Sequence, residues 1–555
     1  MSIRYANPCP KFDVFLDGRV AVENELQAFT RACHVYNKEN RRRGYIKRRK
    51  TKRRYYKLGL VAEIETETTN DQIDSLLMVG VRTFYFDAFR NRPENVQQMI
   101  QRTKIQIEQY RLGETASLLV TSLAITINGE NCVTGRMRNN CTDHLKRGEI
   151  VSLTSDERYK YCSYREIAYV SNLSFYLSRL SLNDEIQIGP SLKGPIVKKL
   201  TETIAILVEV AGPLHSYMDV ELPSIAYTLS ADEIPHMFAE DLGIAINANV
   251  NYIVVPKLRN KKYLMILRSY IPEEYALNII GVLDFEYIRD NMCDIRGILK
   301  QLDYLWIPDM FSISHTMQRF VFDEVIPIAK SIRKPIIGTI HMERRIDFNN
   351  FENHYFLWKI DTIFIERSIT CKKYPLIVKK LLPLYDYRKI TVDKCSIVKE
   401  ILTAYDTVVN FIIRTICSVE CQAIFVHATC EPAALALGRV EIYCPVFVVM
   451  QVDEADPFDV SRKHSLARAI QLRRNLQPLL YTEEMNKCDF TAVEYGIDYA
   501  RNKDLLHTGD FIITIEVAKL PEEEEEEEIG EGEDGVILRA TFLPPIKKYE
   551  QFKFS

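Results

Sequence analysis

Residues 304–340 read YLWIPDMFSISHTMQRFVFDEVIPIAKSIRKPIIGTI and contain one strand–helix–strand repeat. The apolar runs 304–307 and 335–340 are short, as buried strands are. Between them, residues 322–332 place apolar side chains at helical spacing. A helix that connects two such strands is typical of a βαβ unit, so this stretch predicts parallel strands covered by a helix.

The same alternation continues on both sides of this stretch. Further strands are expected at residues 58–63, 81–86, 117–127, 253–255, 279–283 and 362–365, with helices at 70–79 and 93–102. Eight such repeats close a (β/α)8 TIM barrel. Residues 132–218 interrupt them with short β runs, and a second α/β region begins near residue 387. The sequence predicts an α/β protein in which a β-rich insertion splits the barrel and a C-terminal α/β domain follows it.

The composition is that of an ordinary globular protein. The 555 residues are 47% hydrophobic and 26% charged, and their formal net charge is -3. This charge favours neither nucleic acid nor an acidic membrane, and no apolar run is long enough to span a bilayer. The 13 cysteines form no CxxC pair, and the first residues do not read as a secretory signal. We therefore expect a cytoplasmic protein with free thiols.

Two charge runs stand out. Residues 41–57 are strongly basic, and we expect a solvated leader, with a polyanion site or a nuclear address as the alternatives. Residues 522–534 are strongly acidic and cannot bury apolar surface, which predicts a disordered loop. This loop lies between two strand-like runs, 510–517 and 536–542, so a hairpin with a long insertion is expected.

Six segments carry recognisable motifs in a fixed order. They are 220–223 (similar to V-D-L-P), 257–259 (S-F-I-R), 334–342 (G-K-P-V-I-C-A-T-Q-M), 361–376 (D-C-I-M-L-S-G-E-T-A-K-G-D-Y-P-L), 423–450 (a run that ends A-R-Y-R-P-R-A-P-I-I-A-V-T) and 509–511 (G-D-V-V-I-V). In this order they resemble the pyruvate kinase family. No single match is specific, but together the matches extend from about residue 55 to the C-terminus.

The resemblance implies four parts. They are a basic leader (1–54), a TIM-barrel A domain (55–129 and 218–386), an inserted β-rich B domain that acts as a lid (130–217), and a C-terminal α/β domain (387–555) with an acidic insertion at 521–535. The family transfers a phosphoryl group from phosphoenolpyruvate to ADP, giving pyruvate and ATP, and it uses Mg²⁺ and K⁺.

This chemistry needs positive charge around the transferred group. By position, the family's phosphate-binding arginine falls on Thr83, its catalytic lysine on Val282 and its proton-donating threonine on Ile340. Two cations are thereby lost, and an arginine contact of this kind is worth about 10³-fold or more in rate.

The cation sites are altered as well. The monovalent-cation positions fall on Tyr85, Asp87, Thr121 and Ser122, and the arginine that follows them falls within one position of Asn128. The metal-binding glutamate becomes Asp284, a shorter carboxylate that can still bind a metal. The second metal carboxylate falls on Phe311, although a two-residue slip would place Asp309 there.

The family's effector loop has also lost its pattern, and its positions are Ala428, Thr429, Cys430, Glu431, Pro432 and Ala433. We therefore expect a catalytically dead or strongly impaired homologue. Its role would be structural or regulatory, in a homo- or hetero-oligomer with pyruvate kinase-type subunits, without nucleic acid or membrane. Two alternatives stay open: an active pyruvate kinase, and a repurposed barrel that binds another phosphorylated metabolite.

Overall fold

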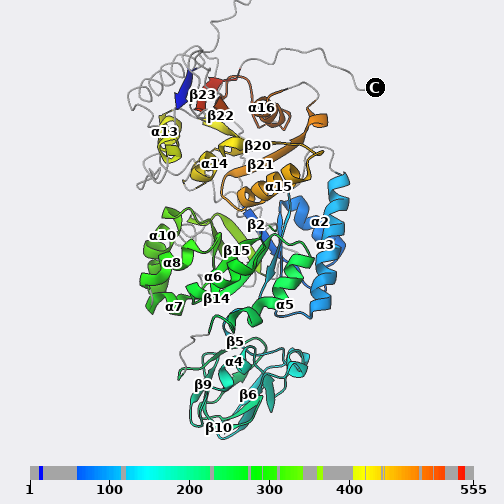
Figure 1. Ribbon diagram of the computed structural model, residues 1–555, viewed down its shortest axis with the longest axis vertical. Helices are drawn as coiled ribbons and strands as arrows, with labels where there is room; N and C mark the ends of the chain where they lie inside the picture. The colour runs from blue at the N-terminus through cyan, green and yellow to red at the C-terminus, as the bar shows by residue number, and fades with distance from the viewer. Residues whose placement is uncertain are drawn as a thin grey trace, which may run out of the picture.

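The computed structural model describes residues 12–16, 59–113, 120–224, 230–308, 313–341, 359–366, 404–518 and 535–543, apart from short gaps inside some of these ranges. The closed barrel and two larger sheets follow one another along the long axis of the molecule (Figure 1), and β6 (Asp143–Leu145) and β12 (Gly212–Leu214) form a further two-stranded sheet. The barrel lies in the middle, the sheet of the inserted residues lies at one end, and the C-terminal sheet lies at the other.

Eight parallel strands close the barrel, in the order β14-β15-β16-β17-β18-β2-β3-β4. Their bounds are β2 (Gly59–Glu63), β3 (Thr83–Phe86), β4 (Ser122–Thr126), β14 (Tyr252–Leu258), β15 (Asn278–Leu283), β16 (Tyr304–Ile307), β17 (Ile336–His341) and β18 (Thr362–Glu366). The prediction of an α/β fold with a closed parallel barrel is confirmed. Both faces of these strands are buried, which explains why their sequences are apolar without alternation.

Helices surround the barrel (Figure 1), and local sequence sets where they begin and end. Helix α2 (Asn70–Val79) begins at a capping box of Thr69 and Gln72 and ends at Gly80, whose φ of 105° suits glycine. The helix predicted at 93–102 continues further, as α3 (Pro93–Gly113). The helix predicted at 322–332 is present as a π-helical turn (Val321–Val325) followed by α10 (Ile326–Ser331), and α9 (His315–Phe320) precedes them.

The residues between β4 and β14 form a separate sheet in the order β5-β13-β9-β10-β11-β7-β8. Its strands are β5 (Cys132–Val133), β7 (Ile150–Thr154), β8 (Ile167–Tyr169), β9 (Glu185–Ile188), β10 (Leu192–Lys199), β11 (Thr203–Leu207) and β13 (Asp219–Glu221). We call residues 130–221 the inserted unit. Helix α5 (Ile234–Asn247) then leads back to the barrel.

The C-terminal sheet has six strands in the order β1-β23-β22-β19-β20-β21. They are β1 (Phe12–Leu16), β19 (Cys421–His427), β20 (Val446–Val452), β21 (Leu476–Thr482), β22 (Phe511–Ala518) and β23 (Gly535–Phe542). The predicted antiparallel pair β22–β23 is present, and the acidic run between them lies outside the described residues, as does the basic run 41–57. Strand β1 comes from the leader and pairs with β23, which the sequence analysis did not predict.

The C-terminal part closes the end of the barrel at which the strands begin. Helix α15 (Pro457–Gln471) ends there, and three barrel hydroxyls donate to carbonyl oxygens in and just after it. Tyr252 donates to Arg468 at 2.8 Å, Tyr304 to Ala469 at 2.9 Å and Thr362 to Leu472 at 2.7 Å. The other end of the barrel, where the strands end, is the barrel mouth. In barrels of this type, active sites lie at that end.

Candidate functional site at the barrel mouth

Aromatic rings fill the interior of the barrel. Tyr85, Trp306 and Phe364 come from β3, β16 and β18 and are all less than 9% exposed. The Tyr85 ring centroid lies 5.4 Å from that of Trp306 and 5.3 Å from that of Phe364, and the last two centroids are 4.4 Å apart. The Trp306 indole N–H donates to the Thr339 hydroxyl at 2.7 Å. We call these three rings the aromatic plug, and together they exclude a substrate from this level of the barrel.

Two positions at which the resembled family has a lysine or an arginine lie level with the aromatic plug or below it. Val282 packs against the cluster that contains the three rings and Ile280. Thr83 is completely buried beside Ser122, and the Thr83 hydroxyl has no hydrogen-bond partner. Neither side chain can offset the charge of a phosphate. Ile340 belongs to β17, but its side chain lies outside what the structure describes.

Two carboxylates at the mouth share one guanidinium. Glu63 ends β2 and is 4% exposed, and Asp87 directly follows β3. Arg90 Nε lies 3.2 Å from Asp87 Oδ2, and Arg90 Nη1 lies 3.9 Å from Glu63 Oε1. Burial, and then the negative charges of Asp87 and Glu63, raise the pKa of the Tyr85 hydroxyl well above its ordinary value.

The K⁺ positions implied by the resemblance do not converge. Tyr85 belongs to the aromatic plug, and Asp87 is held by Arg90. Thr121 and Ser122 lie at the start of β4, where Ser122 pairs with Thr83 at the end opposite the mouth. A potassium ion needs several oxygens around one point, and these four residues do not provide them.

The predicted metal ligand Asp284 is engaged by nitrogen donors. Its Oδ2 lies 2.7 Å from Arg259 Nε, and its Oδ1 accepts from the Tyr287 backbone N–H at 3.3 Å. Magnesium is usually bound by one or two carboxylates together with waters and substrate phosphates. Among the described residues no group of three acidic, histidine or cysteine side chains is placed to hold a metal, and Asp309 and Phe311 lie outside them. The predicted ligand that is described, Asp284, is already engaged by Arg259 and by the Tyr287 backbone.

Two further carboxyl groups lie where the chain leaves the barrel for the inserted unit. Glu130 is 5% exposed and accepts from Asn260 Nδ2 at 3.0 Å. Burial raises its pKa to about 7, against the lowering effects of Asn260 and Arg259. Asp241 on α5 accepts from the Asn128 backbone N–H at 2.7 Å, and burial raises its pKa to about 6. We call this region the junction. The junction was not predicted from the sequence, because single acidic residues beside an insertion form no motif.

The cations around the mouth face acidic groups. Besides Arg90 and Arg259, Lys257 at the end of β14 lies 2.5 Å from Asp219 of β13. The five carboxyl groups described above are Glu63, Asp87, Glu130, Asp241 and Asp284. Glu63, Asp87 and Asp284 lie beside Arg90 or Arg259, whereas burial raises the pKa of Glu130 and Asp241.

The predicted effector loop forms helical turns. Ala428–Cys430 is a 3-10 turn, and α14 (Glu431–Leu437) follows with Pro432 in its first turn. Thr429 donates its backbone N–H to His427 Nδ1 at 3.3 Å, while Cys430 is fully buried. Glu431 adds a negative charge to this turn, and this charge disfavours the binding of an anion by the loop.

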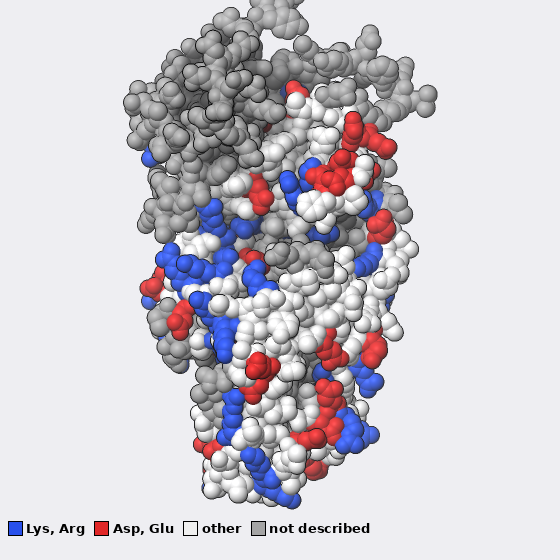
Figure 2. All heavy atoms as spheres, in the orientation of Figure 1, with Lys and Arg blue, Asp and Glu red and all other residues white. Residues whose placement is uncertain are grey.

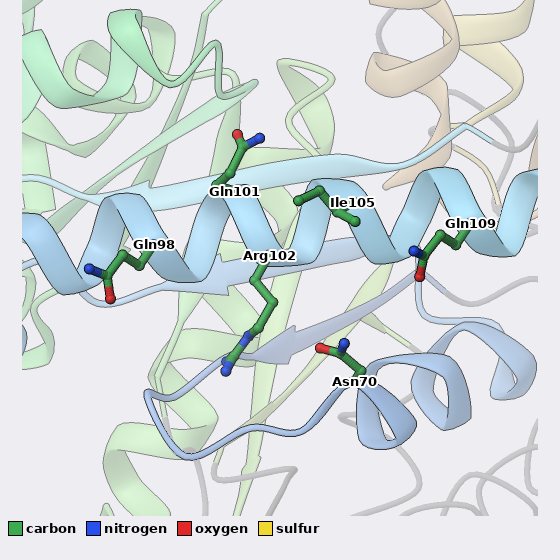
Figure 3. Close-up of a pocket in the computed structure, with 6 residues that line it drawn as sticks. All are labelled: Asn70, Gln98, Gln101, Arg102, Ile105 and Gln109. Atoms are coloured by element: carbon green, nitrogen blue, oxygen red, sulfur yellow. The ribbon is translucent and has the colours of Figure 1, made fainter.

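A groove elsewhere on the surface is unrelated to the mouth. It has a volume of about 360 Å³ and is lined by Gln98, Gln101, Arg102, Ile105 and Gln109 of α3 and by Asn70 of α2. Figure 3 shows Arg102 extending toward the side of Asn70, whereas Gln101 and Ile105 project from the other side of α3. Arg102 is also tied to the Glu65 carbonyl oxygen at 3.4 Å.

The visible surface carries charges of both signs (Figure 2). Basic side chains gather over the barrel side formed by α6 (Lys261–Tyr270), α8 (Ile295–Lys300) and α10, whereas acidic and basic side chains alternate over the inserted unit.

In the described part of the chain, no helix is both long and apolar enough to cross a membrane. No family model matches the chain, and no curated protein sequence matches it.

Proposed function

We propose that this chain is a pyruvate kinase-like protein that has lost phosphoryl transfer and serves a structural or regulatory role. In this proposal the barrel, the inserted unit and the C-terminal part correspond to the family's A, B and C domains. The chain would associate in the cytoplasm with copies of itself or with active pyruvate kinase-type subunits. The motifs at residues 220–223, 334–342 and 509–511, in their fixed order, support this assignment.

One observation supports the loss of activity above the others. The aromatic plug lies directly below the mouth, with Val282 packed against it where the family's lysine would stand. A moving phosphoryl group is stabilised by cations whose charge is not already offset. Here Arg90 and Arg259 are each paired with a carboxylate, at 3.2 and 2.7 Å.

The test is an assay of the purified full chain with phosphoenolpyruvate, ADP, Mg²⁺ and K⁺, with pyruvate measured directly. We expect no turnover above a blank without protein, while an active pyruvate kinase in the same buffer shows that the assay works. A cooperative thermal transition of the same sample shows that the protein is folded. Turnover near that of the active enzyme would refute the proposal and favour the alternative of a working pyruvate kinase.

The proposed association needs its own measurement. The chain is mixed with an active pyruvate kinase, and the mixture is analysed by native mass spectrometry. Mixed oligomers are the expected result. If the two proteins never share a particle and the chain is monomeric at every concentration tested, the structural role in an oligomer is wrong.

A further inference from the structure

Arg90 contacts both the barrel and the inserted unit. It lies in the turn between β3 and α3, and its side chain is 40% exposed. On the barrel side its guanidinium meets the carboxylates of Asp87, at 3.2 Å, and Glu63, at 3.9 Å. On the other side its Cζ lies 5.5 Å from the centroid of the Tyr217 ring, which belongs to the inserted unit.

Tyr217 completes this contact. Its hydroxyl donates to the Arg90 carbonyl oxygen at 3.2 Å, and its ring lies 5.8 Å, edge to face, from the ring of Phe89. Tyr217 itself has a φ of 63°, which an L-residue other than asparagine or aspartate rarely adopts. Such a conformation persists only where surrounding contacts hold it.

The turn that carries Arg90 is itself fixed by Asp87. The Asp87 carboxylate accepts the Arg90 backbone N–H at 3.0 Å, and the Asp87 carbonyl oxygen accepts from Asn91 Nδ2 at 2.9 Å. A second tyrosine of the inserted unit, Tyr161, donates to the Asn91 carbonyl oxygen at 3.1 Å. The Arg92 Cζ lies 5.4 Å from the centroid of the Tyr161 ring. The same short turn therefore binds the inserted unit at two places.

From this geometry we infer that Arg90 is a built-in cation that neutralises Glu63 and Asp87 and clamps the inserted unit to the barrel through Tyr217. We call these four residues the clamp. The resemblance places Asp87 at a K⁺ ligand position, and here a guanidinium meets that carboxylate instead. The inserted unit is consequently held in one orientation without a monovalent ion. This inference does not depend on the proposed loss of turnover.

The first test removes the charge and keeps an unbranched apolar side chain. Hydrogen exchange is measured by mass spectrometry on the full chain and on Arg90→Met, with peptides that cover the clamp and peptides that cover β15 and β16. We expect exchange near Tyr217 to rise roughly tenfold, because a charge-assisted contact is lost, while β15 and β16 stay unchanged. Unchanged exchange near Tyr217 would overturn the inference.

Three further variants keep the test decisive if Arg90→Met folds poorly. Tyr217→Phe keeps the ring over the guanidinium and removes only the hydroxyl, so it should loosen the same peptides less than Tyr217→Leu, which removes both. Arg92→Met is the matched control, because Arg92 also stacks on a tyrosine of the inserted unit but makes no ion pair among the described residues. If Arg92→Met loosens the Tyr217 peptides as much as Arg90→Met does, the pairing with the carboxylates is irrelevant and the inference fails.

The second test addresses the built-in cation. Thermal midpoints are compared in KCl and in tetramethylammonium chloride at equal ionic strength. We expect the parent protein to give the same midpoint in both salts. Arg90→Met should be more stable in KCl, because the carboxylates of Glu63 and Asp87 have then lost the guanidinium and gain from a small cation. A parent protein that itself needs K⁺ for its full thermal midpoint would contradict the inference.

Discussion

Replacing Glu130 by glutamine should make the protein more stable at alkaline pH and leave it almost unchanged in acid. Glutamine keeps the oxygen that accepts from Asn260 at 3.0 Å, and it cannot ionise. Burial moves the pKa of Glu130 from an ordinary value of 4.5 to about 7. At about 1.4 kcal/mol for each pH unit, this amounts to about 3 kcal/mol of folding free energy.

The sign follows from which state holds the proton. Between pH 4.5 and about 7 the folded protein keeps the Glu130 proton and the unfolded chain does not. The contribution of Glu130 to stability is therefore complete in acid and is lost as the pH rises through about 7. Burial also raises the pKa of Asp241, from 3.8 to about 6. Asp241 therefore adds a second loss of folding stability with rising pH, at lower pH than that of Glu130, and this second loss should remain in Glu130→Gln.

Urea denaturation at pH 5, 6, 7 and 8 measures this effect, followed both by tryptophan fluorescence and by circular dichroism. Coincident transitions are required before the two free energies of unfolding are compared. At pH 8 the variant should exceed the parent by up to about 3 kcal/mol, with little difference at pH 5. Glu484→Gln, at an exposed position of the C-terminal part, is the control and should leave the pH dependence unchanged. If Glu130→Gln keeps the pH dependence of the parent, Glu130 is not a buried, proton-holding carboxyl group and the description of the junction is wrong.

Three further substitutions test the barrel by the same denaturation measurement. Trp306→Leu removes the indole bonded to Thr339 at 2.7 Å and part of the aromatic plug, and it should cost about 2–4 kcal/mol; a cost below about 1 kcal/mol would mean that the plug is loosely packed. Gly281→Ala would place a methyl group 2.4 Å from Leu258 Cδ1 and 2.7 Å from Leu302 Cδ2, so a loss of about 1–3 kcal/mol is expected, and an unchanged midpoint would contradict that packing. The Asp361 side chain is 2% exposed and lies 2.7 Å from the Lys330 ammonium group. Lys330→Met removes this ion-pair partner and should cost about 3–5 kcal/mol of stability. The double variant Lys330→Met/Asp361→Asn should recover part of this loss, and no recovery would show that the buried charge is not the cause.

The fold could be predicted because its signal is local. A buried parallel strand such as Tyr304–Ile307 is a short apolar run, and its neighbours repeat the pattern at regular spacing. Helix α2 was predicted with its observed bounds, and the structure shows that short-range features set them, namely a capping box at its start and a left-handed glycine at its end. Strand β1 was not predicted, because its partner β23 lies more than 500 residues away and five residues alone carry no pairing signal.

The site was less predictable, because a strand that is apolar throughout does not show which side chains face inward. Tyr85 and Trp306 point into the barrel, and Phe84 and Phe86 pack against the outer core, although all four are aromatic residues in short strands. A shift of one residue would exchange the two sets. Arg90, Glu130 and Arg259 were missed as site residues for a different reason. Their role comes from partners on other elements, which no local motif specifies.

Under the proposed function, the aromatic plug also bears on whether phosphoryl transfer could return by one substitution. Polar catalytic groups inside a barrel cost stability, because they are buried without full compensation. At the positions that the resemblance assigns to polar groups, Tyr85 and Val282 contribute packing instead, because they belong to or pack against the cluster that contains Trp306 and Phe364. A lysine placed at position 282 would lie against these rings, while Asp284 is already held by Arg259 at 2.7 Å. The charge of the introduced lysine would then lack a carboxylate partner, and the aromatic plug would still fill the space below this lysine. Because each replacement is packed against the others, several would have to change together before the barrel could accept a phosphorylated substrate.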